Sequence, residues 1–256
     1  MTKLTFLGTG TSQGVPMIGC HCEVCSSEDG KDIRLRSSVL VEYNGKVIII
    51  DVGPDFRQQM LREKVENIDH VLITHEHKDH LCGLDDLRSY NFLLERDMDI
   101  YALERVNKVI LKDFDYAFSE HRYPGVPSFK LHNIGSEAFT LDDMQVVPIK
   151  GKHHKLDVLG FRLGQLAYIT DFNHIEDSEI EKLKGIDILV INALRREEHL
   201  SHFTLDQALE VSKKIAPRQT YLTHISHTMG LHEQVNPTLP NNVFLAYDGL
   251  KIQTKE

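Results

Sequence analysis

Residues 74–80 read Thr-His-Glu-His-Lys-Asp-His, the most informative stretch of the chain. The preceding residues, 68–74 (IDHVLIT), are typical of a short buried strand that delivers side chains to the edge of a sheet. Because chance rarely gathers so many metal-ligand side chains, we interpret the stretch as a metal-binding loop rather than a polar loop. The candidate ligands are His75, His77, Asp79 and His80.

The spacing of these ligands divides them into two pairs. His75 and His77 point to the same side of an extended chain, because side chains alternate with a period of two. Asp79 and His80 are adjacent and diverge unless the backbone turns between them. A single ion would not require all four groups, so the spacing predicts two neighbouring metal ions.

Further candidate ligands each follow a strand-like run. Imidazole and carboxylate groups without thiolates suit Zn²⁺, Mn²⁺ or iron. One of these residues has an alternative role, since Asp171 could cap a helix expected over 176–184. The candidate ligands are His153 or His154 after 144–149, Asp171 after 166–170 and His224 after 221–223, whereas Asp51 closes an earlier strand over 47–50 and is not assigned as a ligand.

This set of residues resembles the His-x-His-x-Asp-His signature and the strand-end ligands of the metallo-β-lactamase superfamily. The resemblance spans nearly the whole chain. It implies one hydrolase domain over residues 1–256 with a four-layer αββα sandwich, in which two sheets pack face to face with helices outside. Periodicity alone indicates only an α/β protein.

The resemblance also implies which residues hold which ion. The residues that follow, Lys155-Leu156 and Gly160-Phe161, favour His153 over His154 as the ligand. The two ions would lie about 3.5–4 Å apart and share a hydroxide. The implied sets are His75, His77 and His153 for one ion, Asp79, His80 and His224 for the other, and Asp171 as the bridge.

A second cluster lies in residues 19–25, which read Gly-Cys-His-Cys-Glu-Val-Cys. Three cysteines in a reducing compartment predict a structural zinc, with buried unligated cysteines as the alternative. A fourth ligand is needed, and we favour His227 over the cramped His21. A zinc that links residues 20–25 to residue 227 would close a long loop of the chain, and in principle such a link stabilises a fold most. The predicted ligands are Cys20, Cys22, Cys25 and His227.

This cysteine cluster, together with a His-x-x-His near the C-terminus, resembles the phosphoribosyl cyclic phosphodiesterase branch of the superfamily, which acts in phosphonate breakdown. In that branch a histidine at the position of His202 faces the substrate phosphate. Thr204 is a predicted helix N-cap with Gln207 as its partner, so His202 lies where an anion is favoured. We expect His202 to bind a phosphate oxygen and protonate the leaving group, with an ordinary surface histidine as the alternative. Asp79 is the second predicted catalytic residue.

Several other residues have less specific expectations. Cys82 is expected to be a small buried hydrophobic residue. Arg57, Arg122 and Tyr123 could touch substrate, although surface positions are the simpler interpretation. Residues 119–128 carry turn chemistry and are expected to form a loop near the mouth of the site.

Composition sets the protein class. A chain of 256 residues with 41% hydrophobic and 26% charged residues is ordinary for a globular protein. No apolar run reaches membrane length, and residues 1–8 read as a strand rather than a signal peptide, so we expect a cytoplasmic protein. The net charge of −9 argues against non-specific capture of nucleic acid, but not against a small phosphate ester held by metal ions.

Periodicity and turn residues place the secondary structure. Asn44-Gly45 is a two-residue hairpin signal. Helices are predicted over 54–66, 84–95, 104–118, 176–184 and 204–215. Strands are predicted over 3–7, 38–50, 100–103, 186–191, 219–223 and 243–252, with several more between 129 and 170.

We therefore predict an enzyme: a dinuclear metal-dependent hydrolase that cleaves a small cyclic or linear phosphodiester by attack of metal-bound hydroxide. The alternatives are a tRNA 3′-processing nuclease, a thioester or lactam hydrolase and, least favoured, a metal-binding relative without activity. The expected cofactors are two divalent ions (Zn or Mn) in the active site and one structural Zn. The expected partner is a small phosphodiester, no membrane or nucleic-acid partner is expected, and a homodimer is left open.

Overall fold

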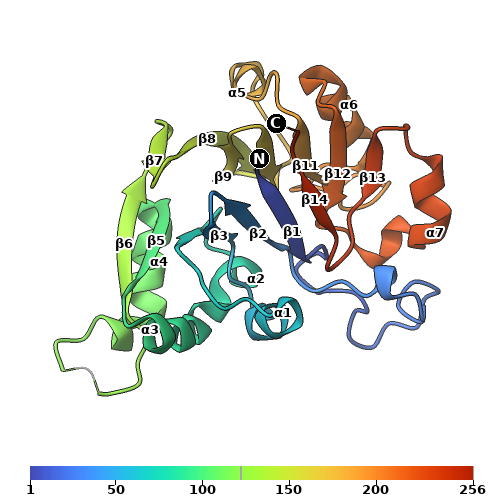
Figure 1. Ribbon diagram of the computed structural model, residues 1–256. Helices are drawn as coiled ribbons and strands as arrows, with labels where there is room; N and C mark the ends of the chain where they lie inside the picture. The colour runs from blue at the N-terminus through green and yellow to red at the C-terminus, as the bar shows by residue number, and fades with distance from the viewer. Residues whose placement is uncertain (122, 256) are drawn as a thin grey trace.

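The computed structural model describes residues 1–121 and 123–255, in which two seven-stranded sheets pack face to face with helices outside both (Figure 1). The first sheet has the spatial order β14 (Lys251–Gln253), β1 (Lys3–Gly8), β2 (Ser38–Tyr43), β3 (Lys46–Ile50), β4 (His70–Leu72), β5 (Met98–Leu103) and β6 (Phe129–Ile134). The second has the order β13 (Val243–Leu245), β12 (Gln219–Thr223), β11 (Ile188–Asn192), β10 (Leu166–Ile169), β9 (Leu156–Leu163), β8 (Met144–His153) and β7 (Phe139–Leu141). The predicted αββα sandwich is confirmed.

The helices divide between the two outer faces. The first sheet is covered by α1 (Phe56–Glu63), α2 (Lys78–Leu81), α3 (Arg88–Leu94) and α4 (Glu104–Asp113). The second is covered by α5 (Asp177–Lys182), α6 (Leu205–Ile215) and α7 (His232–Val235). Short 3-10 turns are η1 (Gly30–Asp32), η2 (Cys82–Leu87), η3 (Asp115–Ala117), η4 (His227–Met229) and η5 (Asn236–Thr238).

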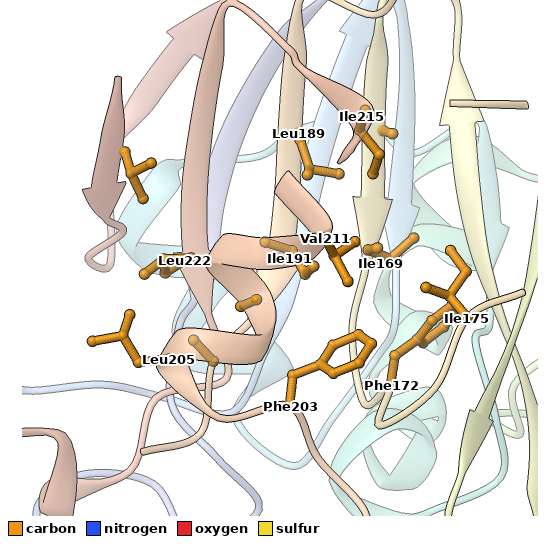
Figure 2. Packing of buried hydrophobic residues seen from close by; sticks show 14 of the residues in the cluster. Ile169, Phe172, Ile175, Leu189, Ile191, Phe203, Leu205, Val211, Ile215 and Leu222 are labelled. Carbon is orange, nitrogen blue, oxygen red and sulfur yellow. The ribbon is translucent and has the colours of Figure 1, made fainter. Parts of the chain in front are cut away.

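Strand β11 shows how the sequence builds three apolar layers. Its residues alternate, so that Leu189 and Ile191 pack under the outer helices, whereas Ile188 and Val190 pack between the sheets. Figure 2 shows α6 laid over this outer face, with Val211 above the strands. Burying each such side chain stabilises the fold by about 1.5–3 kcal/mol.

The direction of the strands determines where functional side chains meet. Strands β3, β4 and β5 are parallel, so they end at one edge of the first sheet. Strands β10, β11 and β12 are likewise parallel in the second sheet. Strand β8 runs the same way as β10, because both are antiparallel to β9.

Some predicted elements need correction. The single strand predicted over 243–252 is wrong: β13 lies in the second sheet and β14 in the first, and the chain crosses between them. The helix predicted over 104–118 ends at Asp113 and continues only as the 3-10 turn η3. The Asn44-Gly45 turn is confirmed, with positive φ at both residues (47° and 79°). Cys82 is exposed rather than buried.

No helix within the described residues is long and apolar enough to cross a membrane.

Candidate metal centre

The predicted ligands meet at the edge where the parallel strands end. Residues 74–80 follow β4, Asp171 follows β10, His224 follows β12, and His153 is the last residue of β8. The backbone does turn within the first loop, because α2 begins at Lys78. This turn lets the adjacent Asp79 and His80 serve the same site.

Three residues that end strands at this edge adopt left-handed backbone conformations. The φ angles are 66° at Asp51, 63° at Asp171 and 55° at His224. Non-glycine residues rarely adopt such angles, and the surrounding fold must hold them there. Strained backbone at three converging polar residues is itself an indication of a functional site.

The first group of side chains contains three imidazoles. The ring centroids of His75 and His77 are 4.6 Å apart, and those of His77 and His153 are 5.0 Å apart. Their candidate ligand atoms all lie within 4.8 Å of one another. The neighbouring His154 is exposed and donates its backbone N–H to Asn173, so the structure brings His153 into the cluster and leaves His154 outside.

The second group is arranged around Asp171. Its Oδ2 atom lies 3.3 Å from His80 Nε2 and 3.2 Å from His224 Nδ1. Asp79 Oδ2 lies 3.2 Å from the same nitrogen of His80. Because Asp171 and His75 also form a close group with His80, the Asp171 carboxylate lies between the two sets. Asp171 is not the helix cap, since the cap of α5 is Glu176.

Hydrogen bonds behind the cluster fix which ring nitrogens face it. His80 Nδ1 lies 2.7 Å from Asp51 Oδ2, so its Nε2 is directed at the cluster. His153 Nδ1 lies 2.8 Å from the carbonyl oxygen of Ser201, which leaves its Nε2 free to bind a cation. Such outer hydrogen bonds orient imidazole ligands in metal sites.

Buried nitrogen atoms in the cluster lack hydrogen-bond partners among the described residues. They are His75 Nε2, His80 Nε2 and both ring nitrogens of His224. Buried polar atoms without partners are costly, and each such group requires an explanation. Metal coordination supplies one, because the donors are imidazole and carboxylate groups suited to Zn²⁺ or Mn²⁺.

The charges of the cluster are strongly coupled. Burial lowers the pKa of His75, and nearby His80 lowers it further. Burial disfavours the charged form of His80 as well, but Asp79, Asp171 and Asp51 outweigh it and raise its pKa well above the usual value. The carboxylates thus favour a positive charge at this position, and a divalent cation would supply it.

His202 lies against the same cluster. Its ring centroid is 4.6 Å from that of His153 and 4.8 Å from that of His224. Its Nδ1 lies 3.7 Å from Asp171 Oδ1. Burial, followed by the neighbouring His224, lowers the pKa of His202 to about 3, so the ring is neutral near pH 7. The predicted cap beside it is confirmed, since Thr204 and Gln207 form a capping box.

The cysteine cluster also assembles as predicted. His227 Nδ1 lies 3.4 Å from the sulfur of Cys20 and 3.3 Å from that of Cys22. The candidate ligand atoms of these residues and Cys25 lie within 4.8 Å of one another. The hydrogen bond from His227 is the largest factor that lowers the pKa of Cys22 to about 6, whereas burial raises that of Cys25 to about 11.

Two of the residues suggested as substrate contacts, Arg57 and Tyr123, are exposed, as the simpler interpretation expects. Arg57 is exposed and lies with Met60 and Leu61 along the groove between α1 and α3. Tyr123 is exposed on its loop, and Arg122 lies outside the described residues. Thr74 was not predicted as a functional residue, although it directly precedes the His-x-His-x-Asp-His signature and donates its N–H and hydroxyl to Asp51.

Comparison with known proteins agrees with this geometry. The family model described as the beta-lactamase superfamily domain matches residues 46–225, a range that holds every predicted ligand of the strand-end cluster. The chain is also similar to a solved diphosphatase of the PhnP family. The two are 41% identical with a TM-score of 0.93, over 100% of this chain and 98% of the other.

Two further proteins similar to this chain carry names of different activities. The chain is 43% identical over 252 residues to an octanoyltransferase from Porphyromonas gingivalis (strain ATCC BAA-308 / W83), covering 97% of this chain and 51% of the relative. It is 28% identical over 191 residues to a ribonuclease Z from Nostoc punctiforme (strain ATCC 29133 / PCC 73102), covering 73% of this chain and 52% of the relative. The chain therefore spans about half the length of these two proteins.

Proposed function

We propose, because this chain belongs to the β-lactamase superfamily, that it is a metal-dependent hydrolase acting on a small cyclic or linear phosphodiester. The observation that carries the proposal is the convergence of two metal-ligand groups on Asp171, with buried imidazole nitrogens that have no hydrogen-bond partner among the described residues. The predicted superfamily and its fold are confirmed, and the similarity to a PhnP-family diphosphatase agrees with the predicted branch.

The cluster would hold two divalent ions. When bound, the ions would supply Lewis acidity that polarises a phosphoryl oxygen and lowers the pKa of water. Asp171 would serve both ions, because its carboxylate forms a close group with His75 of one set and His80 of the other, and it also lies beside His224. The ligand sets are His75, His77 and His153 for one ion, and Asp79, His80 and His224 for the other.

Residues on the solvent-exposed side of the cluster would admit and bind the substrate. His75 and His80 are fully buried, whereas His77 is exposed, so substrate would approach past His77. His202 is neutral near pH 7 and can donate one ring N–H to a phosphate oxygen. Its place before the capped start of α6 favours an anion there. Because the neutral ring carries no imidazolium proton, its lowered pKa does not support proton donation to the leaving group, which stays a prediction.

The names of the relatives support cleavage of phosphorus–oxygen bonds. The PhnP-family relative is called a diphosphatase, and several curated relatives are called ribonuclease Z. A tRNA-processing role is the second candidate, but the net charge of −9 is unfavourable for holding a polyanion. We do not propose octanoyl transfer for this chain, since the match covers only 51% of the octanoyltransferase.

A structural zinc is also part of the proposal. Cys20, Cys22, Cys25 and His227 would hold it as a closed site of four ligands. The lowered pKa of Cys22 favours the thiolate that binds metal. His227 begins η4, three residues after His224, so this zinc would anchor the segment that supplies a ligand to the strand-end cluster.

The test is turnover of bis-p-nitrophenyl phosphate by purified protein with added Mn²⁺ or Zn²⁺. The matched pair of variants is His153→Ala and His154→Ala, because the two histidines are adjacent and only the first lies in the cluster. We expect the first variant to lose turnover and the second to keep it. Absence of turnover by the wild type with either metal, or equal effects of the two variants, would contradict the proposal.

A panel of substrates then separates the candidates. It holds a cyclic phosphate, a linear phosphodiester, a diphosphate, a precursor tRNA and a thioester. Preference for the small phosphate compounds supports the proposed function. Preference for the precursor tRNA would favour the ribonuclease-type alternative, and preference for the thioester would overturn both.

A further inference from the structure

Helix α4 holds both residues that flank the ligand His77. Each carboxylate oxygen of Glu76 accepts a hydrogen bond from Arg105 Nη1, at 2.9 Å in both cases. On the other side of His77, the amine of Lys78 pairs with the carboxylate of Asp113. Arg105 lies in the first turn of α4 and Asp113 is its last residue, so one helix spans the loop.

Arg105 makes a second contact that joins two ligand-bearing segments. Its Nη2 donates to the carbonyl oxygen of Asp157, near the start of β9. The β8–β9 hairpin carries His153, while the segment around Glu76 carries His75 and His77. Arg105 therefore links the two parts of the chain that supply one complete ligand group.

Two charged residues at the ends of α4 oppose the helix dipole. A helix favours acidic residues at its N-terminus and basic residues at its C-terminus, because of its dipole. Glu104 and Lys112 obey this preference, but Arg105 and Asp113 do the opposite. A locally unfavourable choice at both ends is expected where a residue serves a functional site.

The helix is a rigid support for these contacts. Val106 and Ile110 are fully buried in the apolar layer beneath it. The side-chain amide of Asn107 donates to the carbonyl oxygen of His132 at 3.0 Å and to Asn133 Oδ1 at 2.8 Å. Because its buried face is fixed to β5 and β6, the exposed face can hold the loop in place.

We propose that Arg105 is a positioning residue for the metal site formed by His75, His77 and His153. It holds Glu76 and the β8–β9 hairpin in fixed relation, so that the three imidazoles stay convergent. Occupying both oxygens of Glu76 also keeps that carboxylate away from the cation. The inference rests on the proposed function, since it requires that this group bind an ion.

The test measures metal retention rather than activity alone. Purified Arg105→Met protein is dialysed against increasing chelator, and metal content per chain is compared with that of the wild type. We expect affinity to fall roughly tenfold for about one ion per chain, the usual effect of losing an outer contact. The matched control is Lys108→Met, which removes the exposed pair with Glu104 on the same helix.

Two further variants separate positioning from general stability. Arg105→Lys keeps the charge but cannot reach Glu76 and Asp157 together, so it should also release the ion more readily. The double variant with Glu76→Gln should be no worse than Arg105→Met alone, because both act through one contact. Thermal midpoints measured in chelator should match that of Lys108→Met.

Failure of the proposed function and failure of the positioning role would give different results. A wild type that binds no ion at the histidine group would overturn the proposed function. A wild type that binds it, beside an Arg105→Met variant that holds it equally tightly, would overturn only the positioning role. Full recovery of affinity by Arg105→Lys would do the same, since charge alone would then be sufficient.

Discussion

The Nδ1 atom of His80 lies 2.7 Å from Oδ2 of Asp51, and both side chains are completely buried. Asp51 also accepts the backbone N–H and the hydroxyl of Thr74. Burial raises the pKa of Asp51, and His80 acts in the opposite direction. Asp51 belongs to neither ligand group, yet it determines that His80 presents Nε2 to Asp79 and Asp171.

Replacing Asp51 by Asn should therefore weaken metal binding without touching a ligand. An amide can donate to Nδ1 of His80 and favour the wrong tautomer, so we expect affinity to fall about 10–100-fold. Metal content after dialysis against chelator is the measurement. Asp55→Asn is the control, since Asp55 pairs with Arg36 outside the cluster. Wild-type retention by the Asp51 variant would contradict this role.

Replacing His202 by Ala tests its part in turnover. We expect turnover of bis-p-nitrophenyl phosphate to fall ~100-fold or more while metal content is unchanged. Loss of an ion would instead identify His202 as a ligand, because it lies within reach of His153 and Asp171. His199→Ala is the control, since His199 is an exposed neighbour of His202, with the two ring centroids 5.1 Å apart. Unchanged turnover would remove His202 from the mechanism.

His232 should make stability depend on pH. Burial and the charge of Arg34 lower its pKa to about 4, from 6.5 in the unfolded chain. Arg34 Nη2 donates to Nδ1 of the neutral ring at 3.3 Å, and protonation would break that bond. The unfolded state thus binds more protons between these values, so this stability is complete above pH 6.5 and is lost as pH falls toward 4.

The measurement is urea unfolding of the wild type and His232→Gln at about pH 7.5 and about pH 5. The wild type should lose more stability on acidification than the variant, because glutamine does not titrate. Protonation of the metal ligands affects both proteins equally and cancels in the difference. An equal loss in both would show that His232 contributes nothing to the pH dependence.

Gly53 should tolerate no side chain. A Cβ atom there would lie 2.1 Å from the carbonyl oxygen of Asp79, so Gly53→Ala must displace the loop that carries this ligand. We expect a loss of about 1–3 kcal/mol in unfolding free energy together with weaker metal binding. Gly135→Ala is the control, since no atom lies within 4 Å of its Cβ position. Equal effects of the two substitutions would contradict the steric argument.

Much of the site could be predicted because its ligands are marked locally. Asp171 and His224 each end a recognisable apolar run, and parallel strands bring such ends to one edge. Spacing in the sequence alone could not show which of His153 and His154 belongs to the cluster. Their different burial, which depends on the β8–β9 hairpin, separates them.

The supporting contacts could not be predicted, because they join residues distant in sequence. Nothing near Arg105 marks it as the partner of Glu76, and nothing near Arg34 indicates that it is buried against His232. The break between β13 and β14 was missed for the same reason, since Asp248 turns the chain through contacts with Thr9 and Leu35. Periodicity reads one segment at a time and does not detect such pairs.

The divalent metal content of the purified protein, measured by elemental analysis, tests the two metal sites together. We expect about three ions per chain, two in the histidine–aspartate cluster and one in the cysteine site. The variant Cys22→Ser should lose about one of them and keep the catalytic pair. A wild-type protein that holds no ion, or about one ion that Cys22→Ser alone removes, would contradict this expectation.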